Sequence, residues 1–314
     1  MLNLIWNEWI KIFNRKGTYV MIGILLIVVI GMGILTKTIG ETDPSTHWKK
    51  ELAQENADMK KELKSVNSPT LENNYKESIA INEYRIKHDL PPEDGTYSAM
   101  SFISDAGDMI SLIGLFVITV AAGIVANEFS WGTVKLLVIR PISRFKILLS
   151  KYITVLLLAL ALIAILFASA GITGLVLFGA GDGSQVHLAY ANGNVKEQSL
   201  ILHLAGSYLL HSISLLMMST MAFMISAVFR NSSQAVGISI FLLVMGGTVT
   251  NLIAMKFDWA KYILFANTDL TQYVDGTPLV SGMTMGFSIS VLAVYFIIFQ
   301  VLAFGVFTKR DIAS

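Results

Sequence analysis

Residues 127–151 read NEFSWGTVKLLVIRPISRFKILLSK, a charged stretch between two long apolar segments. Short loops rich in Lys and Arg are retained on the cytoplasmic side of a membrane. The stretch therefore predicts a cytoplasmic loop, and it fixes the orientation of the segments on either side. Its one acidic residue is Glu128, and its basic residues are Lys135, Arg140, Arg144, Lys146 and Lys151.

The composition is typical of an integral membrane protein. Of the 314 residues, 54% are hydrophobic and 14% are charged, and the mean hydropathy is +0.62. A soluble domain carries about 25% charged residues, so this chain has too few to cover a water-exposed surface. Cysteine is absent, which excludes disulfides and thiolate sites. The net charge of +1 gives no indication of a nucleic-acid partner.

Six apolar segments are long enough to cross a membrane, because a hydrocarbon core about 30 Å thick needs roughly 20 apolar residues in a helix. We therefore predict an all-α membrane protein with six transmembrane helices. The third segment is longer than a straight span needs, which indicates a tilted or protruding helix. The segments are Tyr19–Leu35, Met109–Ala126, Ile147–Phe178, Leu204–Phe229, Ala235–Ala254 and Met285–Phe307.

The charges beside these segments predict a multi-pass cell-membrane protein with both termini in the cytoplasm. Basic residues precede the first segment, occur in the short turn at 230–234 and follow the last segment. No small-residue cleavage site closes the first apolar run, so we expect a retained anchor. The predicted parts are an interfacial helix at 1–18, a first span at 19–36, an extracellular helical insertion at 37–106, and a core of five spans at 107–314 with a cytoplasmic loop at 127–146.

The first residues form an amphipathic helix, which we expect to lie in the membrane interface. A buried cytoplasmic helix is the alternative. Its apolar residues recur at helical spacing and are Leu2, Ile5, Trp6, Trp9 and Phe13.

The long insertion predicts two outer helices, separated at Ser68-Pro69 and ended by Pro91-Pro92. Each apolar stripe is too thin for an independent domain, so we expect a hairpin that packs on itself or on a second copy. The hairpin could capture substrate, act as a docking lid for a partner, or be a solvated spacer.

Catalytic and energy-converting groups are missing from the sequence. The cores of the predicted spans contain no Asp, Glu, Lys or Arg, whereas ion-coupled transporters usually bury such groups. Asp108 and Lys151 lie at span ends, where we expect them to reach headgroups or water. The phosphate loop G-x-x-x-x-G-K-[ST] is absent, as are H-E-x-x-H and G-x-S-x-G. We predict that the chain is not an enzyme and that any energy comes from elsewhere.

The fourth predicted span carries a cluster of polar and methionine side chains. These could line a substrate path, or they could serve close helix packing. For His211 we expect a hydrogen bond between helices, and no metal site is predicted. The weak substrate-lining candidates are Ser207, His211 and Met218.

The order of residues in the charged loop resembles a known pattern, E…GT…LL…P-x-SR…K, of the permease subunits of type 2 ABC transporters. It is carried by Glu128, Gly132-Thr133, Leu136-Leu137, Pro141, Ser143-Arg144 and Lys151. In that family the segment is cytoplasmic and lies between the second and third spans, where the charge pattern places it here. The amphipathic N-terminal helix resembles the family's elbow helix. Residues 256–284 have the aromatic and turn content of its short outer helices.

The resemblance implies that the loop docks on a separate ATP-binding subunit. Ser143 can cap the helix that follows Pro141, and Phe129 could share an apolar stripe on a short helix that ends at Arg140-Pro141. The implied coupling residues are Glu128, Phe129, Gly132, Thr133, Leu136 and Leu137. The implied anchors of the loop are Arg140, Pro141, Arg144 and Lys151, of which the three basic residues would lie at headgroup level. These basic residues could instead only set the membrane topology.

The sequence therefore predicts a permease subunit that exports an amphipathic substrate such as a peptide, an antibiotic or a lipid-linked molecule. By resemblance, its partners are the ATP-binding subunit, a second permease subunit (identical or related) and the bilayer. No cofactor is expected in this chain, since ATP and Mg would bind the partner. The alternative is a non-transporting membrane sensor or assembly scaffold with an extracellular ligand-binding hairpin.

Overall fold

The structure is a computed structural model. It describes residues 1–39, 48–65, 69–90, 97–133, 142–179, 186–191, 194–229, 231–274 and 278–309.

The described part of the chain is mostly helical and contains six helical segments long and apolar enough to cross a membrane. Each overlaps one of the six predicted spans. The largest difference is in the second, which begins at Ala99, ten residues before the expected Met109. These segments identify the chain as a membrane protein. They are α2 (Lys16–Ile39), Ala99–Ile124, α9 (Arg144–Phe178), α10 (Leu200–Val228), α11 (Ser232–Ala254) and α13 (Met285–Lys309).

The second span is assembled from three short elements, α5 (Ala99–Ala106), η2 (Gly107–Met109) and α6 (Ile110–Ile124). α5 packs on α9 so closely that a Cβ on Gly174 would lie 3.0 Å from the Cα of Ala99. The last residues of the predicted insertion therefore belong to a span. The span also contains Asp105 and Asp108, both exposed.

The third span is a single helix of 35 residues. At 1.5 Å per residue it is about 52 Å long, well beyond a hydrocarbon core of about 30 Å. The hydroxyl of Ser143 accepts a hydrogen bond from the backbone N–H of Lys146 at 3.4 Å, which confirms the predicted N-terminal cap. Gly179, with φ +75°, follows the last residue of the helix.

The core of the bundle lies where α6 meets α9, α10 and α11. α6 is the most completely buried of the membrane helices, and its side chains Ile113, Val117 and Ile118 are fully covered. In contrast, α2, α11 and α13 have broad exposed apolar faces. This pattern fits a membrane protein, because such faces can lie against lipid.

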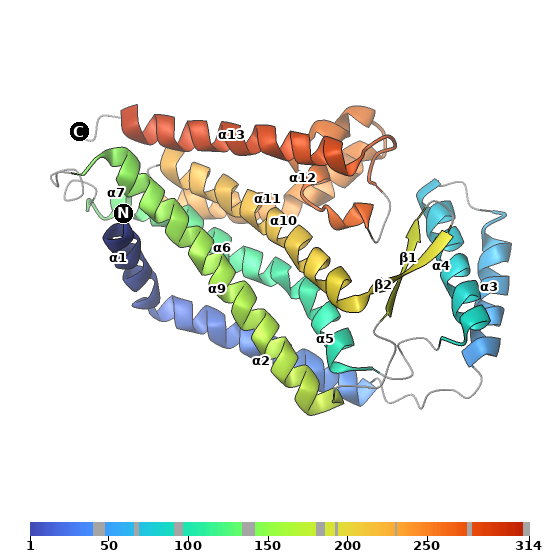
Figure 1. The fold of residues 1–314 in the computed structure, drawn as a ribbon. Helices are drawn as coiled ribbons and strands as arrows, with labels where there is room; N and C mark the ends of the chain where they lie inside the picture. Colours follow the sequence, from blue (N-terminus) through green and yellow to red (C-terminus); the bar gives the residue numbers. More distant parts are fainter. Residues whose placement is uncertain are drawn as a thin grey trace.

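A separate layer caps one end of the bundle (Figure 1). It contains two antiparallel helices, α3 (Trp48–Glu62) and α4 (Pro69–His88), which bear out the two helices expected in the insertion. Lys60 pairs with Glu83 at 2.6 Å across them. The layer also contains two antiparallel strands, β1 (Val186–Ala191) and β2 (Asn194–Ser199). The prediction of a purely helical chain was wrong here, and the strands pack on α4.

The opposite end of the bundle holds the amphipathic α1 (Leu2–Phe13) and the five-residue α7 (Ala126–Ser130), with the last turn of α13 at the same end (Figure 1). Between α11 and α13 the chain forms three short helices, η3 (Asp258–Tyr262), α12 (Leu264–Asn267) and η4 (Thr271–Tyr273). Short helices were expected in this segment.

Candidate functional site

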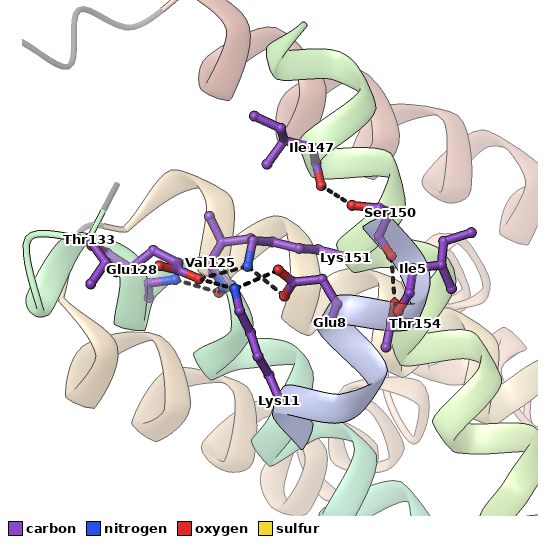
Figure 2. A network of polar contacts seen from close by, with 12 residues as sticks. Ile5, Glu8, Lys11, Val125, Glu128, Thr133, Ile147, Ser150, Lys151 and Thr154 are labelled. Atoms are coloured by element: carbon purple, nitrogen blue, oxygen red, sulfur yellow. Dashed lines mark hydrogen bonds and ion pairs between the residues drawn. The ribbon is translucent and has the colours of Figure 1, made fainter. Parts of the chain in front are cut away.

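Four charged side chains from three separate elements meet beside α7 (Figure 2). The Nζ of Lys151 on α9 lies 2.8 Å from Glu8 Oε2 on α1 and 2.9 Å from Glu128 Oε1 on α7. The Nζ of Lys11 on α1 lies 2.8 Å from Glu8 Oε1 and 3.4 Å from Glu128 Oε1. We call Glu8, Lys11, Glu128 and Lys151 the charge cluster. Its two cations balance its two carboxylates.

The charge cluster is buried on the side of Lys151. The Lys151 side chain is 1% exposed, and the side chains of Glu8 and Glu128 are 8% and 13% exposed. The expectation that Lys151 reaches headgroups or water was therefore wrong. Its ammonium group is directed between two carboxylates, which compensate the loss of its hydration.

A break in the second span positions Glu128. The helix α6 ends at Ile124, and the backbone N–H groups of Val125 and Ala126 donate to the hydroxyl of Ser226 on α10, at 3.1 Å and 3.0 Å. Ser226 is fully buried, so it satisfies two donors that the break removes from regular helical bonding. The chain then restarts as α7, which directs Glu128 toward α1 and α9.

The far end of α7 is held as well. Gly132 follows it with φ +71°, a conformation that favours glycine. The next residue, Thr133, donates its hydroxyl hydrogen to Glu128 Oε2. On the other side, Asn127 Oδ1 accepts a hydrogen bond from the hydroxyl of Ser232 at the start of α11. The contacts of Thr133 and Asn127 therefore hold α7 and Glu128 in place beside the two lysines.

The charge cluster shifts the pKa values of Glu128 and Lys11, which lie outside the membrane-spanning helices. Burial alone would raise the pKa of Glu128, but Lys151, Thr133 and Lys11 outweigh it and lower that pKa to about 2. Burial alone would lower the pKa of Lys11, but its contacts with Glu8 and Glu128 raise it. Both groups therefore remain charged over the physiological pH range.

This arrangement joins α1, α7 and α9 mechanically. Removing one member of a buried ion pair leaves an uncompensated charge and costs about 3–5 kcal/mol. A displacement of α7 that separates Glu128 from Lys151 breaks this buried ion pair and is therefore opposed unless α9 and α1 follow. The geometry suits transmission of movement between a surface segment and membrane helices.

Two further loop residues contact the last span. Arg144 Nη1 donates to the backbone carbonyl of Thr308 at 3.3 Å, near the C-terminal end of α13 where a cation is favourable. The rings of Phe129 and Phe307 are 6.3 Å apart, edge to face. The helix that contains Phe129 ends at Ser130. The expected apolar stripe with Leu136 and Leu137 lies outside the described part of the chain. The expected site residues outside the described part of the chain are Leu136, Leu137, Arg140 and Pro141, together with the basic Lys135.

The three weak substrate-lining candidates all lie on α10, away from the charge cluster. Met218 is 7% exposed and packs in the bundle core. His211 Nδ1 lies 2.9 Å from the carbonyl of Ser207, so its hydrogen bond is within one helix and not between helices as expected. Among the described residues, no group of three or more His, Cys, Asp or Glu side chains could hold a metal ion.

The pairing of Glu8 was not predicted from the sequence, and Ser226 was expected only as one of the polar residues of the fourth span that favour close helix packing. Glu8 is the one acidic residue in the basic N-terminal segment, and it stands one helical turn before Lys11. An unexplained carboxylate on an otherwise apolar or basic helix was the available signal. For Ser226 only a packing role was predictable, because its bonds to the backbone arise where the break after α6 meets α10.

Residues 76–313 match the model of a protein family described as "Protein of unknown function (DUF2705)". The chain belongs to this family. It is 58% identical over 316 residues, the full length of both chains, to a protein of Bacillus subtilis (strain 168) named "Uncharacterized protein YhcI". It is also 35% identical over 215 residues to "Uncharacterized membrane protein YdbK" of the same organism, covering 68% of this chain and 83% of the relative.

Proposed function

We propose that the chain is the membrane-spanning subunit of an ABC exporter, driven by ATP that a separate subunit binds and hydrolyses. The observation that carries the proposal is the charge cluster. Glu128, from the loop that resembles the coupling segment of type 2 permeases, is paired with a buried lysine of a membrane helix. Movement imposed on α7 from outside the membrane would therefore reach α9 and α1 directly.

The proposed orientation places the charge cluster and both termini in the cytoplasm. Then α1 lies along the inner membrane interface, and the layer formed by α3, α4 and the two strands lies outside the cell. The described structure supports this orientation, because these two groups of elements occupy opposite ends of the bundle (Figure 1). The positive loop at 127–151 and the basic N-terminal segment support the inner assignment of their end.

The transported substrate would be amphipathic. The described spans carry apolar side chains almost throughout, buried in the bundle core and exposed on α2, α11 and α13. The buried charges of the cluster are already paired with one another. A pathway between two such subunits, identical or related, would offer an apolar surface and no strong site for an ion.

Co-purification of the tagged full-length chain from its native membranes tests this proposal. We expect a protein with a phosphate loop to be recovered with it, and Gly132→Ala to reduce the recovery. The matched control is Gly282→Ala. Both glycines have positive φ, +71° and +83°, and open space at the Cβ position, so each alanine strains the backbone without a clash. Gly282 lies at the opposite end of the bundle. Recovery of no ATPase, or equal losses in the two variants, would contradict the proposal.

A sensor or assembly scaffold remains a second candidate because the outer layer is built as one unit. Tyr84 on α4 donates its hydroxyl hydrogen to Glu197 Oε1 on β2 at 3.2 Å, which joins the insertion to the strands. A sensor needs such a ligand-facing layer but no ATPase at α7. Export that is abolished by Gly132→Ala but survives replacement of 48–90 by a short flexible linker would favour the exporter. The reverse result would favour the sensor.

A further inference from the structure

A shallow apolar groove of about 490 Å³ runs between α1 and α9. A volume of this size is within the usual range for small-molecule sites, roughly 300–1,000 Å³. Five of its six lining side chains are apolar or aromatic. They are Leu2, Ile5, Trp6, Trp9 and Leu157, and the sixth is Asn3.

The groove opens onto the membrane-facing surface. Its α9 wall is Leu157, which is 39% exposed, and the neighbouring Leu160 is 61% exposed on the same membrane span. The groove therefore lies beside an exposed apolar face of this candidate membrane span. Its α1 wall presents Trp6, 64% exposed, and indole rings are enriched where hydrocarbon meets headgroups. Lipid is the molecule that reaches such a position at high concentration.

We propose that this groove binds one acyl chain of a membrane phospholipid, and that the bound lipid holds α1 in the position that pairs Glu8 with Lys151. The proposal concerns the membrane-embedded chain itself and does not depend on a partner ATPase.

The second part of the proposal, that bound lipid supports the pairing of Glu8 with Lys151, rests on the positions of groove-lining and ion-pairing residues on α1. Ile5 and Trp9 face the groove, while Glu8 between them faces Lys151 at 2.8 Å. The carbonyl of Ile5 also accepts a hydrogen bond from Thr154 on α9 at 3.5 Å. An acyl chain packed between α1 and α9 would add apolar contact along one side of this junction, and about 25 cal/mol is gained for each Å² of apolar surface covered. Lipid occupancy and ion pairing would therefore support each other.

Native mass spectrometry of the full chain released from phospholipid nanodiscs tests the proposal. The test variant is Leu157→Trp, which fills the groove, and the control is Leu160→Trp, which adds the same side chain on the exposed face beside it. We expect wild type and the control to retain one phospholipid and the groove variant to lose it. Equal retention by the two variants, or a wild-type chain released without bound phospholipid, would overturn the proposal.

A second measurement needs no substitution in the groove. With Trp48, Trp131 and Trp259 changed to Phe, the remaining fluorescence comes from Trp6 and Trp9, which both line it. We expect phospholipid brominated on its acyl chains to quench this fluorescence in detergent and to saturate near one lipid per chain. Quenching that rises in proportion to lipid without saturating indicates ordinary solvation by lipid and rejects a defined site.

Discussion

At the scale of single residues, Lys151 shows how one charge can hold three elements. Its methylene stem crosses the interior of the bundle end, and its ammonium group has lost nearly all contact with water. The carboxylates of Glu8 and Glu128 provide the electrostatic stabilisation that water would otherwise give to this ammonium group. Lys11 is 40% exposed, so its contacts with the same carboxylates are screened by solvent and contribute much less.

Lys151→Met should lower the free energy of unfolding by about 3–5 kcal/mol, because two carboxylates then face each other without their buried counter-ion. Thermal unfolding in detergent measures the change. Lys146→Met is the control, since Lys146 is exposed on the same helix and its loss should be nearly neutral. Adding Glu128→Gln to Lys151→Met should recover part of the loss. No recovery would mean that Lys151 stabilises the fold by packing rather than by charge.

The lowered pKa of Glu128 predicts a stability that depends on pH. A carboxyl group whose pKa falls on folding, here from 4.5 to about 2, stabilises the protein above pH 4.5. That contribution is lost as the pH falls through the interval from 4.5 toward 2. Between these values, the unfolding temperature of wild type should fall more steeply than that of Glu128→Gln. Asp58→Asn on the exposed surface of α3 should retain the wild-type slope, and a Glu128→Gln slope equal to wild type would exclude this role.

At the scale of elements, the short α12 depends on a glycine in its neighbour α11. A Cβ on Gly246 would lie 2.4 Å from ring atoms of Phe265, so α12 packs where α11 has no side chain. Asn267 at the end of α12 is fully buried and accepts a hydrogen bond from the Ser288 hydroxyl at 2.6 Å. Packing and hydrogen bonding together hold the α11–α13 connection against the bundle.

Gly246→Ala should therefore destabilise the protein by about 1–3 kcal/mol, the usual cost of overpacking. The control is the adjacent Gly247→Ala, where a Cβ meets nothing within 4 Å and a better helix former should be neutral or slightly stabilising. Phe265→Leu should relieve part of the loss in the double variant. Thermal unfolding of the four chains provides the comparison, and equal effects of the two glycine substitutions would contradict this packing.

The elements differ in how far the sequence reveals them. Long apolar runs predict the spans because crossing a bilayer requires a minimum length of apolar helix. The position of Ser143 shortly after Pro141 predicts that it caps the N-terminus of α9. The strands were missed although Asn192-Gly193 stands between Ala191 and Asn194, which are paired across the sheet, and Asn-Gly is the strongest short hairpin signal. The junction of Glu8 with Lys151 was beyond sequence reasoning, because it joins residues 143 positions apart through the packing of α1 on α9.

At the scale of the whole molecule, the polar groups are divided between the two ends of the bundle. One end carries α1 and α7, which hold the charge cluster, and the other carries the layer of α3, α4 and the strands (Figure 1). Ion pairs in this layer, such as Lys60 with Glu83, have both side chains about half exposed. Those of Lys151 are buried. The layer of α3, α4 and the strands is therefore suited to water, whereas the charge cluster lies at the edge of the apolar bundle.

This division predicts opposite accessibility of the two ends in intact cells. Because the chain has no cysteine, single substitutions give an unambiguous label. Lys76→Cys on α4 and Lys146→Cys on α9 both replace exposed side chains. A membrane-impermeant maleimide should label the Lys76→Cys chain in intact cells and the Lys146→Cys chain only after permeabilisation. Labelling of Lys146→Cys from outside would place α7 and the charge cluster on the extracellular side, where no ATP-driven partner could engage them, and the proposed exporter would then be excluded.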